Sequence, residues 1–225
     1  MGIRYAVNEK FFDRWSPRMA YLLGYLYADG DLIYTPKMRG RYVGVTSTDR
    51  ETISKFKLWL GSGHTIIQRE SPHKNGKLVY RLRIGNAKLY KSLERKGLYQ
   101  NKSLTITFPS VPRRVLRHFI RGYFDGDGCV HLEKIVRKSG KIRPKKLNVI
   151  FTSGSGIFLK VLSERISEET GVKPANVIRS WTAYQLRYST FGSECLFKLM
   201  YDKAPKNEYL ERKYAIFTEH FEMKA

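Results

Sequence analysis

The sequence predicts an α+β protein made of two copies of one unit, each with the element order α-β-β-α-β-β-α. Three segments recur in the same order: LLGYLYADG returns as IRGYFDGDG, VTS as FTS, and YRLR as YQLR. The recurrence places Asp29 and Asp127 98 residues apart (127 − 29), while Val45 and Phe151 are 106 apart (151 − 45). The second copy therefore gains eight residues in its first hairpin, and we divide the chain into repeats 1–108 and 109–225.

Each recurring nonapeptide is predicted to end a helix. Ser16 and Pro17 supply an N-cap and a first helical residue, and Ser110 is predicted to open the second helix. The second helix carries an apolar stripe at three- and four-residue spacing: Val115, Leu116, Phe119, Ile120, Tyr123 and Phe124. Small residues stand one turn apart in both helices, namely Gly24 and Ala28, and Gly122 and Gly126. Such small side chains allow two helix backbones to approach closely, so we expect the two helices to pack together.

The rest of the first copy is predicted to contain two hairpins and two helices. The expected elements, in order, are strands 31–36 and 41–48 around the turn 37–40, a helix capped by Thr48 or Asp49 and ended at Gly61, strands 64–70 and 77–84 around the turn 71–76, and a helix 87–95 stopped by Gly97. The first of these helices should bury Ile53, Phe56, Leu58 and Leu60. In the last strand, Leu78, Tyr80, Leu82 and Ile84 should face opposite to Lys77, Val79, Arg81 and Arg83.

The second copy repeats this order. The expected elements are strands 130–137 and 145–151 around a long basic turn 138–144, a helix that buries Phe158, Leu159, Leu162 and Ile166, and strands 177–181 and 184–189. Each copy therefore predicts one antiparallel sheet with an apolar face and a polar, basic face.

The two aspartates at the ends of the paired helices suggest a metal site. A helix C-terminus carries about half a negative charge, so an aspartate there is disfavoured by up to about 1 kcal/mol. Two facing carboxylates would repel each other by roughly 4 kcal/mol more at an effective dielectric of about 20. A divalent cation such as Mg²⁺ reverses this cost, because it prefers hard oxygen ligands.

A simple turn is the competing interpretation of one Asp-Gly pair, since glycine and aspartate both favour turns. A calcium loop fits less well, because Cys129 stands where its third oxygen ligand belongs. The duplication of the motif in matched surroundings favours the metal site.

Composition points to a polyanionic partner. The chain has 42 Lys and Arg residues against 20 Asp and Glu residues, a formal net charge of +22. A very soluble or ribosome-associated protein would show the same charge. Cys129 and Cys195 lack CxxC spacing, and there is no long apolar run or signal-peptide pattern. We therefore expect a soluble intracellular protein with no membrane association.

The motifs LLGYLYADG and IRGYFDGDG resemble the two signature helices of single-chain LAGLIDADG homing endonucleases, and the resemblance covers roughly residues 16 to 220. Tyr27 departs from the pattern, where the second copy keeps Asp125. The resemblance implies a site-specific endodeoxyribonuclease that binds metal through Asp29 and Asp127 and the carbonyls of Ala28 and Gly126. It also implies Mg²⁺ as cofactor, Mn²⁺ as a substitute, Ca²⁺ binding without cleavage, hydrolysis of one strand per metal, and short 3′ overhangs.

Further residues follow from the same resemblance. The family keeps one basic residue per active site late in each repeat, after the final helix, which implies catalytic roles for Lys102 and Lys213, 111 residues apart (213 − 102). Their role would be to hold water and to offset developing negative charge. Ser47 and Ser153 stand where the family often has a polar, water-binding side chain.

The basic strand faces are predicted to form a saddle over duplex DNA. A β-ribbon fits the major groove, where arginine pairs with guanine and glutamine with adenine. The expected outward residues are Arg41, Arg69, Arg81, Arg83, Lys134, Arg137, Lys146, Arg179, Gln185 and Arg187. Any one of them could instead contact a phosphate or only solvent.

Two other functions remain open at this level. Relatives of this fold act as RNA-binding intron maturases, and basic strands alone do not separate duplex DNA from structured RNA. A DNA-binding protein that has lost cleavage is a third possibility, although both signature aspartates are intact. Because the chain contains both motif helices, we expect a monomer.

Overall fold

A computed structural model describes residues 5–36, 40–70, 76–140 and 142–224, which form two four-stranded antiparallel sheets and their covering helices. The first copy comprises α1 (Pro17–Asp29), β1 (Gly30–Thr35), β2 (Gly40–Ser47), α2 (Arg50–Trp59), β3 (Ile66–Glu70), β4 (Leu78–Gly85) and α3 (Ala87–Arg95). The second comprises α4 (Arg113–Asp127), β5 (Gly128–Val136), β6 (Ile142–Ser153), α5 (Gly156–Thr170), β7 (Ile178–Ser180), β8 (Ala183–Tyr188) and α6 (Thr190–Tyr201). The predicted fold class and the predicted element order of both copies are confirmed.

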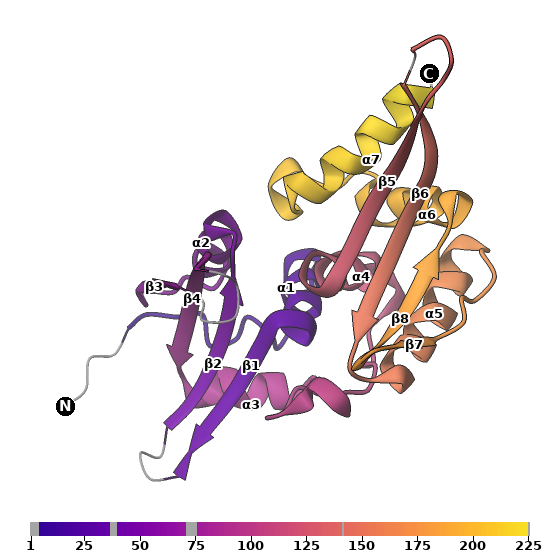
Figure 1. Cartoon of the computed structure of the whole chain (residues 1–225). Helices are drawn as coiled ribbons and strands as arrows, with labels where there is room; N and C mark the ends of the chain where they lie inside the picture. The colour runs from indigo at the N-terminus through magenta and orange to yellow at the C-terminus, as the bar shows by residue number, and fades with distance from the viewer. Residues whose placement is uncertain (1–4, 37–39, 71–75, 141, 225) are drawn as a thin grey trace.

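The two sheets have the same topology. Their strand orders are β1-β2-β4-β3 and β5-β6-β8-β7, and every pairing is antiparallel. In each sheet the strand after the motif helix pairs with the next strand, which in turn pairs with the last strand of the second hairpin. Figure 1 shows α1 and α4 side by side between the two sheets. The motif helices therefore form the centre of the molecule.

The close packing predicted for α1 and α4 is confirmed at the glycines. A methyl group on Gly24 would lie 2.1 Å from the carbonyl oxygen of Phe119, and one on Gly122 would lie 1.9 Å from that of Tyr21. Both distances are far below van der Waals contact, so backbone fills the space that any side chain would need. Only glycine fits at either position without a shift of one helix.

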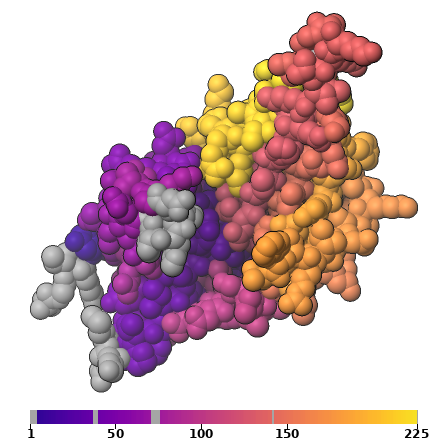
Figure 2. All heavy atoms as spheres, in the orientation of Figure 1, coloured from indigo at the N-terminus to yellow at the C-terminus, as the bar shows by residue number. Residues whose placement is uncertain are grey.

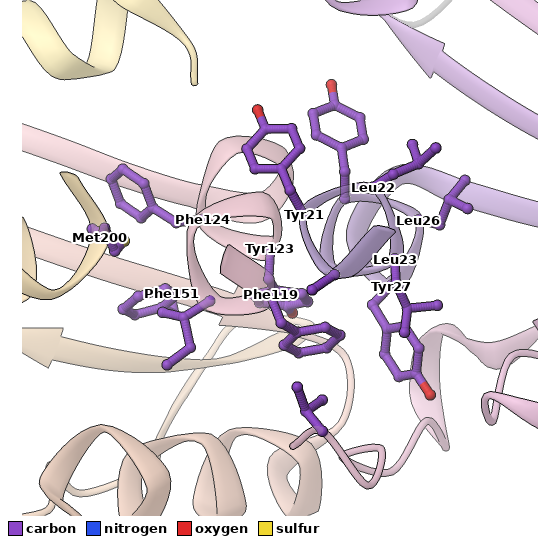
Figure 3. Close-up of a cluster of buried hydrophobic side chains, with 14 of the residues drawn as sticks. Tyr21, Leu22, Leu23, Leu26, Tyr27, Phe119, Tyr123, Phe124, Phe151 and Met200 are labelled. Atoms are coloured by element: carbon purple, nitrogen blue, oxygen red, sulfur yellow. The ribbon is translucent and has the colours of Figure 1, made fainter. Parts of the chain in front are cut away.

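Aromatic side chains seal the junction between the two copies. Tyr27 of α1 packs edge-on against Phe119 of α4 and stacks with Phe158 of α5, with ring centroids 5.3 and 6.0 Å apart. Tyr123 packs on Phe158 at 4.6 Å. Figure 3 shows Tyr27, Phe119 and Tyr123 with the leucines of α1 in one continuous cluster. One core therefore runs through both repeats.

Local capping follows the sequence in the first copy and departs from it in the second. Ser16 accepts a hydrogen bond from the backbone of Met19, with Pro17 at the first helical position, as predicted. The prediction that Ser110 opens the second helix is wrong, because α4 begins at Arg113 with Pro112 as its N-cap. A residue that precedes proline is disfavoured in the helical conformation, so the helix cannot start before Pro112.

The buried face of α2 also differs in part from prediction. Ile53, Phe56 and Leu60 are buried, but Leu58 is 77% exposed. Leu58 lies two residues after Phe56 and five after Ile53, which places it on the opposite side of a 3.6-residue helix. In β4, Leu82 and Ile84 are buried as predicted, whereas Leu78 is exposed and Val79 is buried.

The β5–β6 hairpin has longer strands and a shorter turn than predicted. Residues 142–144 belong to β6 and pair with 134–136 of β5, after a bulge beside Glu133 and Lys134. Pro144 is tolerated there because β8 pairs only with Val149–Ser153, which leaves this part of β6 with one free edge. The predicted turn positions 37–39, 71–75 and 141 lie outside the described residues.

A helix that the sequence did not predict closes the second copy. It is α7 (Glu211–Lys224), which packs against β5 and β6 after the short η3 (Lys206–Glu208). Its buried residues are Lys213, Phe217 and His220. Tyr214, Phe217 and Phe221 recur at three- and four-residue spacing and all pack on Phe197 of α6. The sequence therefore carried an apolar stripe for this helix that the prediction overlooked.

The outer shape reflects the unequal hairpins. Figure 2 shows two lobes that meet along their length, with the β5–β6 hairpin projecting beyond the second lobe. Both cysteines are free, as the absence of CxxC spacing suggested. Among the described residues, no helix combines the length and apolarity that crossing a bilayer would need.

Candidate metal centre and nucleic-acid interface

Asp29 and Asp127 are the last residues of α1 and α4, so close packing of the helices brings both acids to one place. A methyl group on Gly126 would lie 2.3 Å from Cβ of Ala28 and 3.6 Å from Oδ2 of Asp29. The carboxylate of Asp29 therefore lies beside the residue that precedes Asp127. The side chain of Asp29 is exposed and that of Asp127 is partly buried.

The charge of Asp127 is disfavoured in this position. Burial raises the pKa of Asp127 to about 7, with a further contribution from the negative charge of Asp29, while Lys102 and Lys213 act in the opposite direction. The two acids therefore repel each other, as expected from their duplicated sequence positions.

Lys102 begins the short η2 (Lys102–Leu104) and is buried, with 6% of its surface exposed. Its Nζ donates a hydrogen bond to the carbonyl oxygen of Gly30 at 2.8 Å. Burial lowers the pKa of Lys102, and the nearby charges of Asp127, Asp29 and Asp31 raise it, in that order of size. Asp127 is the acid that affects Lys102 most, although it belongs to the other repeat.

Lys213 lies in the first turn of α7 and is also buried, with 4% exposed. Its Nζ donates to the carbonyl oxygens of Gly128 at 2.6 Å, Asp125 at 2.9 Å and Phe124 at 2.5 Å. Burial lowers the pKa of Lys213 to about 8, although the charge of Asp125 opposes this shift. The ammonium thus lies at the negative end of the α4 dipole.

The two lysines have equivalent contacts. Lys102 donates to the glycine that follows Asp29, and Lys213 donates to the glycine that follows Asp127. The family resemblance implied this pair, and the charges of both lysines act on Asp127. Lys102 follows α3 and Lys213 follows α6, the final predicted helix of each repeat, and Lys213 itself lies in the unpredicted α7.

The two serines are also related by the repeat. Ser47 accepts a hydrogen bond from the hydroxyl of Tyr25 at 3.1 Å, and the hydroxyl of Tyr123 donates to the carbonyl of Thr152, beside Ser153, at 2.7 Å. Each serine also accepts a bond from a backbone N–H two residues later. These contacts place Ser47 and Ser153 at the junction of strand and helix, with Ser153 the more buried.

The donor set fits a hard divalent cation. Two carboxylates converge at adjacent helix ends, and the anionic form of Asp127 is destabilised by burial and by Asp29. Among the described residues, no three His, Cys, Asp or Glu side chains form a cluster that could hold an ion by themselves. A bound cation would therefore need backbone carbonyls, water or phosphate oxygens in addition, which is the usual surrounding of Mg²⁺.

The strand register decides which basic residues face away from the helices. Arg81 and Arg83 alternate with buried Leu82 and Ile84, so they face outward. By the same alternation the outward set also contains Arg69, Lys146, Gln185 and Arg187, and Arg137 is exposed at the tip of the β5–β6 hairpin. Seven of the ten predicted residues therefore have the expected orientation.

The predicted orientation is wrong for Arg41, Lys134 and Arg179. Arg41 shares its strand face with buried Val43, and its guanidinium lies 4.8 Å from the ring centre of Tyr34. Lys134 shares a face with Leu132 and forms an ion pair with Glu219 of α7. Arg179 is opposite Tyr184, which packs on the core side.

The outward residues are held in place by neighbours on the same face. Arg81 pairs with Asp31 at 3.0 Å, and the guanidinium of Arg83 lies 4.0 Å from the ring centre of Tyr42. Arg187 donates to Oε1 of Gln185 through Nε at 3.1 Å and Nη2 at 2.8 Å. These contacts fix long side chains before any partner binds, which lowers the entropy lost on binding.

Sequence reasoning missed three residues beside the centre: Tyr27, Arg121 and Asp125. All three are buried, and Arg121 has no exposed surface. Two signals in the sequence pointed to them: Tyr27 and Asp125 differ at the same motif position, and Arg121 and Asp125 are opposite charges four residues apart in one helix.

Comparison with solved structures defines the class of fold. The chain is similar to the I-LtrWI LAGLIDADG homing endonuclease bound to target DNA, with 13% identity and a TM-score of 0.61, over 96% of this chain and 91% of that one. It is similar to the I-AabMI meganuclease bound to uncleaved DNA, with 13% identity, a TM-score of 0.58, and coverage of 93% and 92%. It is also similar to the homing endonuclease I-WcaI bound to its DNA recognition sequence, with 11% identity and a TM-score of 0.59, over 92% of this chain and 91% of that one.

The whole chain therefore has the fold of LAGLIDADG homing endonucleases. Residues 16–97 match the family model of the LAGLIDADG-like domain. A comparison with curated proteins gives no match.

Proposed function

We propose that the protein is a site-specific endonuclease that hydrolyses both strands of duplex DNA. The observation that carries this proposal is the meeting of Asp29 and Asp127 at adjacent helix ends, each followed by a glycine whose carbonyl binds a buried lysine. Two such half-sites match the two strands of a duplex. Family resemblance and the DNA-bound relatives support the choice of partner.

The proposed division of labour follows the repeats. Residues 1–108 and 109–225 would each contact one half of the DNA site, with the outward arginines of β4 and β8 in the major groove. Asp29 and Asp127, with the carbonyls of Ala28 and Gly126, would hold divalent metal. Mg²⁺ bound there would supply a Lewis acid and a water molecule of lowered pKa. We propose short 3′ overhangs, use of Mn²⁺ in place of Mg²⁺, and binding of Ca²⁺ without cleavage.

The side chains of the protein have separate tasks in this scheme. Lys102 and Lys213 are charged donors whose position is fixed by carbonyl oxygens, so they can offset negative charge on a phosphate without reorganisation. Ser47 and Ser153 would bind water beside them. The lowered pKa of Lys213, about 8, allows it to lose its proton more readily than an exposed lysine.

Cleavage of a randomised plasmid library tests the proposal directly. The purified protein is incubated with the library and Mg²⁺, and all new ends are sequenced, with the Asp29→Asn, Asp127→Asn double variant and chelator as controls. We expect one enriched site with staggered ends that both controls abolish. A protein that binds structured RNA tightly and cuts no member of the library would favour the maturase function. Specific DNA binding without any cleavage would favour the non-cleaving alternative.

The proposal also requires a monomer that holds both half-sites. The glycine faces of α1 and α4 already contact each other, so neither is free to bind a second copy. Sedimentation equilibrium at low micromolar concentration should give the monomer mass of 26.3 kDa. A dimer mass would contradict the arrangement of one half-site per repeat.

A further inference from the structure

Two buried side chains at equivalent positions contact the segments that carry the two lysines. Tyr27 and Asp125 each lie two residues before a signature acid and have 3% and 1% exposed surface. The hydroxyl of Tyr27 donates to the carbonyl oxygen of Lys96 at 2.7 Å, ahead of Lys102. Oδ2 of Asp125 accepts from the backbone N–H of Leu210 at 3.0 Å, ahead of Lys213. The chemistry differs, but each side chain binds the backbone that leads to a lysine in its own repeat.

Asp125 fixes the start of α7. The carbonyl of Leu210 accepts bonds from Lys213 and Tyr214, so Leu210 begins the first turn of this helix. Oδ2 of Asp125 also accepts the hydroxyl of Tyr21 at 2.6 Å, a bond from α1 to α4. The carboxylate is therefore oriented by one bond while it holds Leu210 by another, three residues before Lys213.

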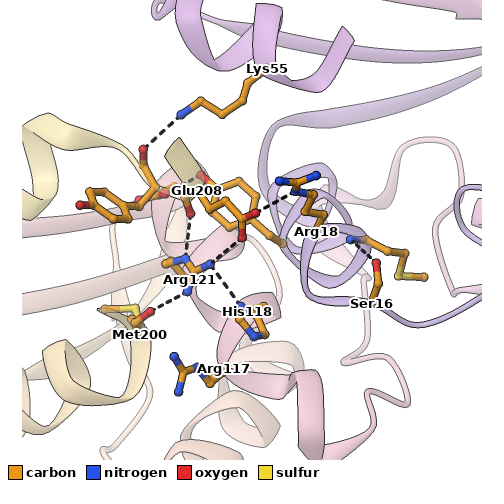
Figure 4. A network of polar contacts seen from close by, with 12 residues as sticks. Ser16, Arg18, Lys55, Arg117, His118, Arg121, Met200 and Glu208 are labelled. Carbon is orange, nitrogen blue, oxygen red and sulfur yellow. Dashed lines mark hydrogen bonds and ion pairs between the residues drawn. The ribbon is translucent and has the colours of Figure 1, made fainter. Parts of the chain in front are cut away.

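Arg121 holds the same segment one turn earlier on α4. It is fully buried, and its guanidinium donates to the carbonyl oxygens of Glu208 at 2.9 Å and Met200 at 2.7 Å. Glu208 in turn pairs with Arg18 of α1 at 2.8 Å. Figure 4 shows Arg18 and Arg121 both reaching Glu208, and Arg121 also reaching Met200. Arg117 of α4 also donates to the carbonyl oxygen of Asp202, so the chain from Met200 to Leu210 is attached to α4 at four points before it reaches Lys213.

Tyr27 acts at a greater distance from its lysine. Lys96 is the C-cap of α3, and Gly97 has a φ of +90° and would place a methyl group 2.5 Å from the Tyr27 hydroxyl. The hydroxyl therefore fixes the point where the chain leaves α3 and turns toward Lys102. Six residues separate this contact from Lys102, compared with three for Asp125.

We propose that Asp125, with Arg121, and Tyr27 are positioning residues that fix Lys213 and Lys102 respectively, each for its own half of the centre. The inference rests on the proposed function only for what the lysines do. The first copy has Tyr27 where the second has Asp125, and both can fix a backbone segment. The phenol donates a hydrogen bond to a carbonyl oxygen, whereas the carboxylate accepts one from a backbone N–H. The unequal sequence at this position therefore preserves one role in both repeats.

Acetylation of individual lysines tests the proposal without any need for activity. Wild type and variants are treated with acetic anhydride at one pH, and the modification rates of Lys102 and Lys213 are measured by mass spectrometry. Asp125→Ala removes the bonds to Leu210 and Tyr21 and should raise the rate at Lys213 by about tenfold or more, with Lys102 unchanged. Tyr27→Phe should raise the rate at Lys102 by about twofold to tenfold, with Lys213 unchanged.

Two further variants separate position from charge and from general loosening. Asp125→Asn keeps an oxygen that can accept both bonds, so the rate at Lys213 should stay well below that of Asp125→Ala. Tyr188→Phe removes another buried tyrosine hydroxyl, which contacts Ser163 in the second copy, and should leave both lysines unchanged. An equal rise at both lysines in Asp125→Ala and Tyr27→Phe would reduce both residues to general stability and overturn the proposal, as would no rise at either.

An activity measurement then links position to cleavage. On a plasmid that carries the target site, Asp125→Ala and Tyr27→Phe should each accumulate nicked plasmid, cut in opposite strands. Slowing of both strands by the same factor in each variant would contradict separate roles. If the wild-type protein cuts no DNA, the proposed function fails, while the acetylation pattern still decides whether these residues position the lysines.

Discussion

The two lysine-binding corners of the molecule have the same chemistry but different supports. Lys102 donates a hydrogen bond to Gly30 and stands on a short turn that follows α3. Lys213 donates to Phe124, Asp125 and Gly128. It stands on a complete helix, and α4 holds the segment that leads into this helix through Arg121 and Asp125. The acid, the following glycine and the lysine are repeated, whereas the elements that hold the lysine are not.

This difference teaches that the repeat preserves the groups at the centre more strictly than their scaffold. Backbone carbonyls at a helix end bind an ammonium regardless of side chains nearby, so the lysine can be supplied from a turn or from a helix. The close contact of α1 and α4 has no such freedom, because it depends on the absence of side chains. The comparison of the two repeats therefore predicts where equivalent changes have equal effects and where they do not.

The largest effect is expected at the symmetric contact of α1 and α4. Gly24→Ala and Gly122→Ala each place a methyl group about 2 Å from a backbone oxygen of the other helix. Helix propensity alone would stabilise alanine by about 1 kcal/mol, but the clash should lower the free energy of unfolding by about 3 kcal/mol or more. Urea denaturation followed by circular dichroism measures this change.

Gly63→Ala is the matched control, since its methyl group would meet its nearest neighbour at an ordinary 3.5 Å. We expect a change below about 1 kcal/mol there. If Gly24→Ala or Gly122→Ala is as stable as the wild type, the helices are farther apart than described.

A smaller effect should distinguish Asp127 from Asp29. The pKa of Asp127 is raised to about 7, mainly by burial, so the folded state prefers the protonated acid. The contribution of Asp127 to the free energy of unfolding is therefore most favourable below the pKa of about 3.9 that the acid has in the unfolded chain. This contribution is lost as the pH rises through 7. As the pH rises from about 5 to about 8, the free energy of unfolding of Asp127→Asn should therefore increase by about 2–4 kcal/mol relative to that of the wild type, with allowance for partial solvent screening.

The same measurement can be extended to the lysine and to metal. The pKa of Lys213 is lowered to about 8, so its cost to folding is present below that pH and is relieved as pH rises toward its ordinary value. The centre should therefore be least stable near pH 7–8, and added Mg²⁺ should narrow the gap between wild type and Asp127→Asn. A difference that does not change with pH would show that Asp127 is not destabilised in the folded protein.

The smallest effect concerns the two unequal first hairpins. Arg137 and Lys138 are exposed at the tip of the long β5–β6 hairpin, whereas Arg41 of the short β1–β2 hairpin faces Tyr34. The protein should protect more DNA on one side of its site. Replacing Arg137 and Lys138 by alanine should reduce the slope of log affinity against log salt by about 0.9 for each phosphate that the variant no longer neutralises.

Fluorescence anisotropy across a salt series measures the slope, and footprinting shows which end of the site becomes accessible to the cleavage reagent. Arg41→Ala is the matched control and should leave the slope unchanged. Weaker protection at both ends of the site would mean that the long hairpin does not extend along one half of the duplex.

Much of this fold was predictable because its strongest signals are local. The caps at Ser16 and Asp49, the stop at Gly97 and the apolar stripe of α4 all depend on residues within one or two turns. The small residues of α1 and α4 predicted the central contact, and their duplication predicted the meeting of Asp29 and Asp127. The lysines were implied by the family resemblance, at matching positions late in each repeat.

The features that were not predictable depend on contacts between distant segments. In α7, Lys213 and His220 are buried through polar contacts to Gly128 and Glu194, which no local pattern indicates. The inward direction of Lys134 follows from the position of Glu219 on that same helix. The roles of Arg121 and Asp125 required knowledge of where residues 200–210 return to α4.

The central claim is that Asp29 and Asp127 form the centre of cleavage and contribute little to DNA affinity. Its most direct test is to measure cleavage rate and binding affinity in parallel on the identified target for wild type, Asp29→Asn and Asp127→Asn. Each variant should lose double-strand cleavage by about 100-fold or more, while its dissociation constant stays within about threefold of wild type. Cleavage by both variants at the wild-type rate, or an equal loss of cleavage and affinity, would contradict the account.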